Sequence, residues 1–263
     1  TTPHISVYGI SHVYHRMRPP LFALKNVCFD VTRGEFISII GPSGGGKTTL
    51  LNIVGGLQIP TKGSVTIDGI SPHEAQRRRL LGFVFQDPSL LPWRTVAGNI
   101  ALANEIGIGG NDENPKNVLD IVGLENFAEY YPHELSGGMR QRVALARAFA
   151  VDPDVLLMDE PLGALDEITR SDMRYELLRL WNFSQKTVLM VTHSIPEAVI
   201  LSDRVLIMSA RPGRVVSELE IRLPRPRSEG IERSSEFLSY TYCIREALSR
   251  ATLLDSKNSL ANG

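Results

Sequence analysis

Apolar and polar residues follow two different patterns along the chain. The first is an alternation over 5–31, clearest at 27–31, with a turn-like segment at 16–20. Alternation with period two is typical of strands that bury one face. We therefore predict an antiparallel sheet at the start of the chain, with a further strand over 64–68.

The second pattern consists of continuous apolar runs, which predict strands covered on both faces of a parallel sheet. The run at 36–40 leads through a glycine-rich segment into a helical pattern at 47–54. Further runs lie at 155–158, 188–191 and 205–208, separated by helical patterns at 167–181 and 195–201. Strands that alternate with helices indicate an α/β fold.

A long segment over about 83–150 separates the first two apolar runs, and it has helix-like patterns at 115–122 and 139–150. Because a crossover between parallel strands is usually much shorter, we predict an inserted helical subdomain there. Two prolines at 224 and 226 interrupt the chain later on. We predict one main domain over 1–227 and a short helical tail over 228–263, with its helix near 237–248.

Composition narrows the possible partners. The 263 residues contain 28 Lys and Arg against 29 Asp and Glu, a net charge of -1 that gives no basic field for nucleic acid. No apolar run approaches the ~18 residues of a membrane span, and the first residues do not resemble an export signal. Cys28 and Cys243 are expected to be free, although the sequence leaves a bridge between them open.

The glycine-rich segment fits the phosphate-loop pattern G-x-x-x-x-G-K-[ST] and stands between a strand and a helix, as that loop requires. It consists of Gly41, Pro42, Ser43, Gly44, Gly45, Gly46, Lys47 and Thr48. Its backbone N–H groups suit phosphate oxygens, Lys47 suits the β and γ phosphates, and Thr48 suits Mg²⁺. A glycine-rich turn with a solvated lysine is the alternative, which the flanking strand and helix disfavour.

Two carboxylates, Asp159 and Glu160, follow a buried strand, where ligands of open α/β sheets bind. Asp159 is suited to hold Mg²⁺, and Glu160 to polarise an attacking water. His193 ends another strand and could reach the same edge, although a lone histidine is usually structural. Taken alone, the carboxylates could be a solvated pair and Gln86 a surface amide.

A second anion site is predicted at the start of the helix over 139–150. Ser136 is a plausible N-cap, and Gly137 and Gly138 follow it. Adjacent glycines weaken a first helical turn, so they need a reason such as close approach to a ligand. The alternative is an ordinary capped helix.

In this order the motifs resemble the ABC ATPase family: phosphate loop, Q-loop at Gln86, signature at 135–139, Asp159-Glu160, the 163–166 segment and His193. The resemblance implies a P-loop NTPase core with ATP and Mg²⁺ as cofactors. It assigns catalysis to Glu160, His193 and Gln86, and Mg²⁺ to Thr48, Gln86 and Asp159. It assigns nucleotide binding to Tyr14, Gly41, Pro42, Ser43, Gly44, Gly45, Gly46, Lys47, Thr48, Thr49, Ser136, Gly137 and Gly138. For Tyr14, a plain strand-face tyrosine remains the alternative to stacking on adenine.

The resemblance also implies partners. Two copies would pack head to tail, each phosphate loop facing the other copy's 136–138 segment, with Asp166 at the contact. The resemblance further implies membrane permease subunits and, indirectly, an extracytoplasmic solute-binding protein as partners. It also implies that the protein lies at the cytoplasmic face of the inner membrane. The segment around Trp93 would dock the permease, unless Trp93 belongs to the subdomain core.

Finer features at 89–96, 211–214 and 223–227 are similar to importers of nitrate, sulfonate, taurine or bicarbonate. The chain departs from the family pattern at three positions: Gly45 and Thr48 stand where the family often has serine, and Ser194 stands where it usually has aspartate. The alternatives are an importer for another small solute, an ABC protein of DNA repair or translation, and a P-loop kinase. The kinase has no use for the 135–139 segment. The DNA-repair proteins have long coiled coils, and the translation proteins normally have two cassettes in one chain.

Overall fold

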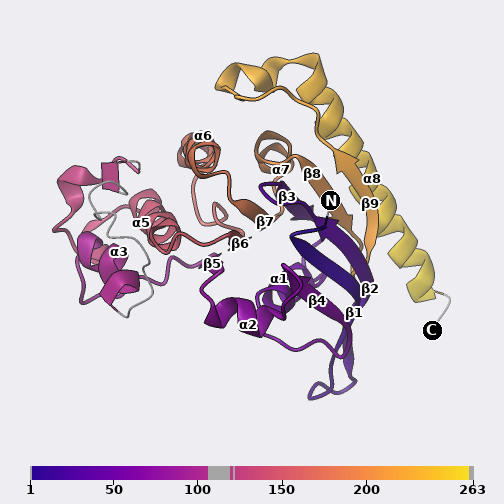
Figure 1. Ribbon diagram of the computed structural model, residues 1–263. Helices are drawn as coiled ribbons and strands as arrows, with labels where there is room; N and C mark the ends of the chain where they lie inside the picture. The colour runs from indigo at the N-terminus through magenta and orange to yellow at the C-terminus, as the bar shows by residue number, and fades with distance from the viewer. Residues whose placement is uncertain (1, 106–118, 121, 261–263) are drawn as a thin grey trace.

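The computed structural model describes residues 2–105, 119–120 and 122–260, and its strands form two sheets (Figure 1). The first sheet is antiparallel, in the order β2-β1-β4. Its strands are β1 (Ile5–Tyr14), β2 (Leu21–Val31) and β4 (Lys62–Ile67). This confirms the predicted antiparallel sheet. The third strand ends before Asp68, because Asp68 and Gly69 turn the chain with φ of 48° and 77°.

The second sheet has the order β5-β6-β7-β3-β8-β9, and only β9 runs antiparallel to its neighbour. Its strands are β3 (Phe36–Ile40), β5 (Leu81–Val84), β6 (Val155–Asp159), β7 (Thr187–Thr192), β8 (Arg204–Met208) and β9 (Val215–Glu220). The four apolar runs are strands, as predicted. The sequence did not show the two edge strands, since β5 has four residues and β9 is mostly exposed.

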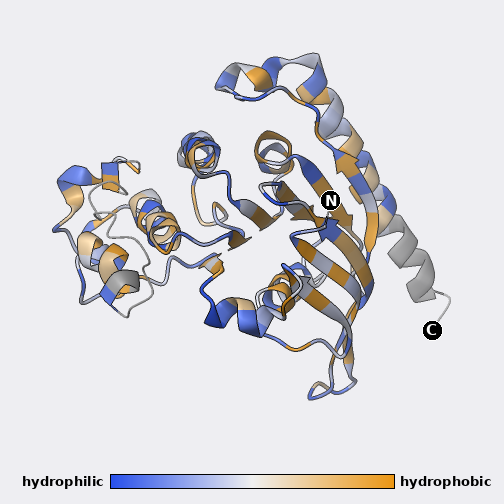
Figure 2. Ribbon diagram, viewed as in Figure 1, coloured by the Kyte–Doolittle hydropathy of each residue, from blue (hydrophilic) through white to orange (hydrophobic). Residues whose placement is uncertain are grey.

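Strand β3 lies between two layers and buries both of its faces. Phe36 and Ile40 pack into a cluster with helices α6 and α7, whereas Ile37 and Ile39 pack against the antiparallel sheet and α1. Figure 2 shows the contrast between continuous hydrophobic colour in the central strands and banding in the antiparallel sheet. Hydrophobic packing on both sides fixes the strand that leads into the phosphate loop.

The helices are α1 (Lys47–Val54), α2 (Pro72–Arg77), α3 (Val96–Glu105), α5 (Gly137–Ala150), α6 (Glu167–Ser184), α7 (Ile195–Leu201) and α8 (Ser235–Leu260). Short 3-10 turns lie at η1 (Glu125–Phe127), η2 (Pro132–Glu134) and η3 (Glu229–Arg233). The predicted helices agree with α1, α6 and α7, although α6 and α8 run longer. Helix α2 was missed despite a visible start signal, since Ser71 caps it and proline follows.

Helices α3 and α5 form a further apolar cluster with the turns between them and with Leu180 of α6, to one side of the parallel sheet (Figure 1). Val143 and Ala146 of α5 belong to this cluster, while Leu145 faces the main core. Strand β5 pairs with β6 as far as Val84, so the helical part begins after that residue. Most of the predicted helix at 115–122 lies outside the described residues, and the subdomain bounds stay a prediction.

The last helix, α8, packs against the main core (Figure 1). Phe237 and Ile244 are buried there together with residues of α7. Ahead of α8, the buried Arg227 donates from Nη1 to the carbonyls of Val199 and Ile200 at 3.0 and 2.8 Å, where α7 ends. Burial lowers the pKa of Arg227 to about 10. The arginine caps helix carbonyls that lack intrahelical partners; the division at residue 227 stays a prediction.

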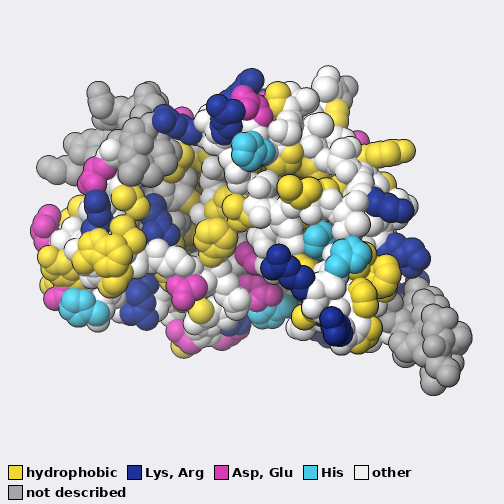
Figure 3. Space-filling view, turned by 90° about the horizontal axis from the view of Figure 1, so that it is seen from below, with side chains coloured by type: hydrophobic (Ala, Val, Ile, Leu, Met, Phe, Trp, Pro, Cys, Tyr) yellow, Lys and Arg dark blue, Asp and Glu magenta, His cyan; other side chains and the backbone are white. Residues whose placement is uncertain are grey.

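On the face seen in Figure 3, acidic and basic side chains are interspersed, which agrees with the near-zero net charge. Cys28 and Cys243 are both exposed and free, as expected. Within the described part of the chain, no helix combines the length and apolar character that a membrane crossing needs.

A buried histidine joins the antiparallel sheet to the parallel one. His4, 2% exposed, places Nδ1 2.6 Å from Thr187 Oγ1 and Nε2 3.5 Å from Asp68. Arg33 pairs with Asp68 and lies 3.6 Å from Asp154. Burial lowers the pKa of His4, Arg33 lowers it further, and the two aspartates oppose them. The folded protein therefore favours neutral His4.

This shift predicts a pH dependence of stability. The folded-state pKa of His4 lies below the unfolded value of ~6.5, so acidification between the two values adds a proton mainly to the unfolded state. The free energy of unfolding should fall from about pH 7 to about pH 5.5, and His4→Gln should reduce that slope by up to ~1.4 kcal/mol per pH unit. Urea unfolding across this range measures it, with exposed His133→Gln as control. Equal slopes for His4→Gln and wild type would contradict the assignment.

Candidate active site

A cavity of about 250 Å³ lies beside the phosphate loop. Its lining consists of Tyr14, Leu21, Ala23, Ser43, Gly44, Gly45, Gly46, Lys47, Thr48, Thr49, Glu160 and Arg211. Residues predicted from three distant parts of the sequence, Tyr14, 43–49 and Glu160, therefore meet there. Leu21, Ala23 and Arg211 were not predicted, because nothing in their local sequence marks them as ligand contacts.

Tyr14 reaches the cavity from the end of β1. Its hydroxyl lies 3.0 Å from Thr49 Oγ1 and donates to Gln58 Oε1 at 3.3 Å, and its ring contacts His12 edge-on. These contacts hold the aromatic ring beside the first turn of α1. Its place in the cavity lining agrees with the predicted contact to a base, which stays a prediction.

The phosphate loop depends on two glycines with left-handed backbone. Gly44 and Gly46 have φ of 74° and 81°, and a Cβ on Gly46 would lie 2.8 Å from Ala23 O. Gly46 is also the N-cap of α1, and no side chain caps that end. The first-turn N–H groups of α1 therefore lack a side-chain acceptor, which is the arrangement that binds phosphate at helix N-termini.

Lys47 turns its amine into the loop. Nζ donates to the carbonyls of Gly41 at 2.8 Å and Pro42 at 3.0 Å, and the residue is 6% exposed. Burial lowers the pKa of Lys47, while Glu160 and Asp159 raise it. Gly41 and Pro42 thus act through Lys47 and are not part of the cavity lining.

Thr48 and Asp159 form an oxygen pair below the loop, with Thr48 Oγ1 donating to Asp159 Oδ1 at 3.1 Å. Burial raises the pKa of Asp159, the Thr48 hydrogen bond lowers it, and the charge of Glu160 raises it again. Burial leaves this carboxylate poorly solvated, and a hydroxyl lies beside it. Such oxygen atoms are the ligands that Mg²⁺ prefers. The two residues fit the predicted metal role.

Glu160 and His193 meet at the same edge of the sheet. His193 Nδ1 lies 3.1 Å from Glu160 Oε2, and the backbone N–H of Glu160 donates to Val191 at 2.9 Å. The contact follows from the sheet, since β6 and β7 are neighbours and Asp159 pairs with Val191. Glu160 has φ of 46°, an unusual conformation for a non-glycine residue that often marks a functional position.

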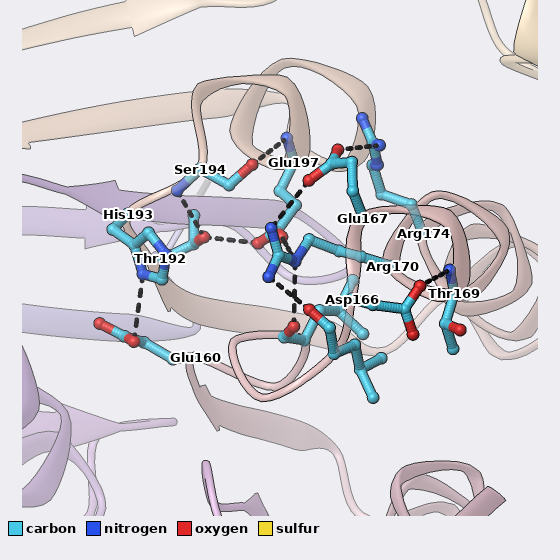
Figure 4. A network of polar contacts seen from close by, with 12 residues as sticks. Glu160, Asp166, Glu167, Thr169, Arg170, Arg174, Thr192, His193, Ser194 and Glu197 are labelled. Atoms are coloured by element: carbon cyan, nitrogen blue, oxygen red, sulfur yellow. Dashed lines mark hydrogen bonds and ion pairs between the residues drawn. The ribbon is translucent and has the colours of Figure 1, made fainter. Parts of the chain in front are cut away.

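Behind this pair, a polar network reaches the 163–166 segment (Figure 4). Thr192 donates to the buried Glu197 at 2.5 Å, and burial raises the pKa of Glu197. Arg170, 3.9 Å from Glu197, donates to the carbonyls of Leu162 and Leu165. The network braces the segment that leads to Asp166, which itself caps α6.

Ser194 stands where aspartate is frequent, yet it performs a clear local task. Its Oγ accepts from the N–H of Glu197 at 3.4 Å and caps α7. Serine and aspartate are both good N-caps, so this departure keeps the loop after His193 in place.

Gln86, Ser136, Gly137 and Gly138 do not line the cavity of their own chain. Gln86 is exposed just after β5, at the sheet edge that carries Asp159. Ser136 caps α5 as predicted, accepting from Met139 at 3.2 Å. A Cβ on Gly138 would lie 2.7 Å from Thr169 Cγ2, so a larger residue there would require Thr169 of α6 to shift.

An arginine that was not predicted connects the signature helix α5 with the segment after Gln86. Arg147 donates to the carbonyls of Ser89 and Pro88 at 2.9 and 2.8 Å. Burial lowers the pKa of Arg147. No local pattern pointed to these contacts, since arginines on helices are usually solvated.

Known proteins are similar to this chain in sequence and in fold. Residues 24–163 match the family described as ABC transporter. The aliphatic sulfonates import ATP-binding protein of Bacillus cereus is 42% identical over 232 residues, 88% of this chain and 92% of the relative. The nitrate import ATP-binding protein of a Synechocystis strain is 42% identical over 249 residues, 90% of this chain and 92% of the relative.

A solved ATP-binding cassette, described as a dimeric post-hydrolysis state bound to ADP and Pi, has a TM-score of 0.72. It is 36% identical, and the match covers 84% of this chain and all of the solved one. Fold and site therefore define an ATP-binding and ATP-hydrolysing cassette. The chain belongs to the ABC transporter family.

The loop geometry predicts the effect of one added methyl group. Gly46→Ala should lower the affinity for ADP by roughly five- to thirtyfold, because a left-handed residue costs roughly 1–2 kcal/mol and its Cβ meets the carbonyl of Ala23. Isothermal titration calorimetry with ADP measures this. Gly230→Ala is the matched control, since a Cβ there meets nothing within 4 Å. Wild-type affinity in Gly46→Ala would refute the role of the backbone conformation.

Proposed function

We propose that this chain hydrolyses ATP to power a membrane importer of a small anion or organic solute. The main support for ATP hydrolysis is that Lys47, Thr48 and Glu160 line the same cavity, and that His193 contacts Glu160. The solute class is supported by the relatives named for sulfonate and nitrate import. An importer of another small solute is the alternative, because the cassette does not choose the cargo.

The residues divide the work of hydrolysis. Lys47 neutralises the terminal phosphates, and the backbone of 43–46 with the first turn of α1 binds their oxygens. Thr48, Asp159 and Gln86 would hold Mg²⁺, which would supply positive charge beside the phosphates. Glu160 orients and polarises the attacking water, and His193 fixes the Glu160 carboxylate at 3.1 Å.

A second copy of the chain would complete each site. Ser136, Gly137 and Gly138 stand at the N-terminus of α5 but outside their own cavity, so they suit the phosphates bound by a partner copy. The solved relative described as dimeric supports this arrangement. Asp166 would lie at the contact, as the family resemblance implies.

Permease subunits would bind beside the Q-loop. Trp93 is 71% exposed, which disfavours the interpretation of this residue as core, and Phe85 nearby is also exposed. Arg94 is ion-paired with Glu105 at 2.6 Å, so it supports local structure rather than offering a free charge. The chain would lie peripherally on the cytoplasmic face of the inner membrane, and a solute-binding protein would act on the other side.

Glu160→Gln tests the hydrolytic role. The amide keeps the shape of the side chain but cannot polarise water as a carboxylate does, so kcat should fall by ~10² to 10⁴ while ATP still binds. Phosphate release by the purified chain gives the rate, and calorimetry with a non-hydrolysable analogue gives the affinity. Near-normal turnover would remove Glu160 from the role.

The same variant reports on the dimer. Trapped ATP should hold two copies together, so Glu160→Gln should elute as a dimer with ATP and as a monomer without it. A monomer at high protein concentration with ATP present would show that the chain cannot complete the site by itself.

Trp93→Ala tests the docking surface. Because the side chain is largely exposed, the variant should keep the stability and basal ATPase activity of the isolated chain, yet recover at least about fivefold less permease on co-purification. Phe183→Ala is the control, since Phe183 on α6 is another largely exposed aromatic residue, at 84%. Unchanged recovery with Trp93→Ala would place the dock elsewhere.

A further inference from the structure

The turn after β8 packs directly on the phosphate loop. A Cβ on Gly213 would lie 2.0 Å from Gly45 O, so only glycine allows this approach. The backbone of Gly213 also donates to Ala23 O at 2.8 Å and accepts from Lys25 N at 3.0 Å. The turn is thus held between β2 and the loop, which fixes the position of Arg211 within it.

Arg211 extends from this turn into the lining of the cavity. Its Nε donates to Gly44 O at 3.3 Å, and its Nη2 lies 3.0 Å from where a Cβ on Gly44 would stand. Of the described residues that line the cavity, Lys47 and Arg211 are the two cations. Lys47 approaches from inside the loop, whereas the exposed Arg211 stands over its outer side.

We propose that Arg211 is a nucleotide-binding residue that donates to phosphate oxygens from the Gly44 side of the loop; this inference rests on the proposed binding of ATP. A guanidinium has five N–H donors in a planar fork, so the single bond to Gly44 leaves donors that match phosphate geometry. A positive charge there also offsets the repulsion between the phosphates and the nearby Glu160. The competing interpretation is that Arg211 only supports the Gly44 carbonyl.

Arg211→Gln separates these interpretations, because glutamine can still donate to Gly44 O but carries no charge. We expect the affinities for the ATP analogue AMP-PNP, for ADP or for both to fall by about tenfold, the size of one charge-assisted hydrogen bond. Calorimetry on the purified chain with Mg²⁺ measures them. A loss confined to AMP-PNP assigns the contact to the γ phosphate, and a loss shared with ADP assigns it to the α or β phosphate.

Arg214→Gln is the matched control, since Arg214 is exposed in the same turn but does not line the cavity. Arg211→Lys keeps the charge and should bind more tightly than Arg211→Gln. Equal affinities of these two variants, an equal loss in Arg214→Gln, or wild-type affinity in Arg211→Gln would overturn the proposal. Thermal unfolding confirms that each variant is folded.

Lys47→Ala distinguishes a failure of the proposed role of Arg211 from a failure of the proposed nucleotide site. If the wild type binds AMP-PNP, Lys47→Ala does not, and Arg211→Gln binds like the wild type, only the role of Arg211 fails. If Lys47→Ala binds as well as the wild type, the proposed nucleotide site itself fails.

Discussion

The site depends on a lysine that the fold keeps largely buried. Lys47 is 6% exposed, and its two hydrogen bonds go to neutral carbonyls of its own loop. A buried charge needs compensation, and carbonyl dipoles supply only part of it. The packed strand β3, the left-handed glycines and the turn after β8 all serve to keep this amine facing the cavity.

The acidic half of the site is arranged by sheet topology. Because β6 lies next to β7, the Asp159-Glu160 pair lies beside His193, although these residues are far apart in the sequence. The carboxylates are partly buried beside one another, and burial raises the pKa of Asp159. Lys47 and Glu160 thus line the same cavity, and Asp159 lies beside its lining residue Thr48.

The features that could be predicted from the sequence are those that depend on residues close together in the chain. Buried strands such as Phe36–Ile40 appear as apolar runs, and the phosphate loop is recognisable from its glycines and lysine. Strand β9 was not visible, because an exposed edge strand needs no apolar pattern. Arg211 and Arg147 were missed for another reason: their partners are backbone carbonyls far away in the sequence. Only the tertiary structure brings such pairs together.

Helix α5 has a function at each of its two ends. The serine that caps its start, Ser136, belongs to the signature, and Arg147, roughly 16 Å further along the axis, binds the carbonyls after Gln86. A continuous α-helix resists stretching, since each turn is closed by backbone hydrogen bonds. The hydrogen bonds of Arg147 therefore tie the segment after Gln86 to the same rigid helix that begins at Ser136, so the distance between these two segments is set by the length of α5.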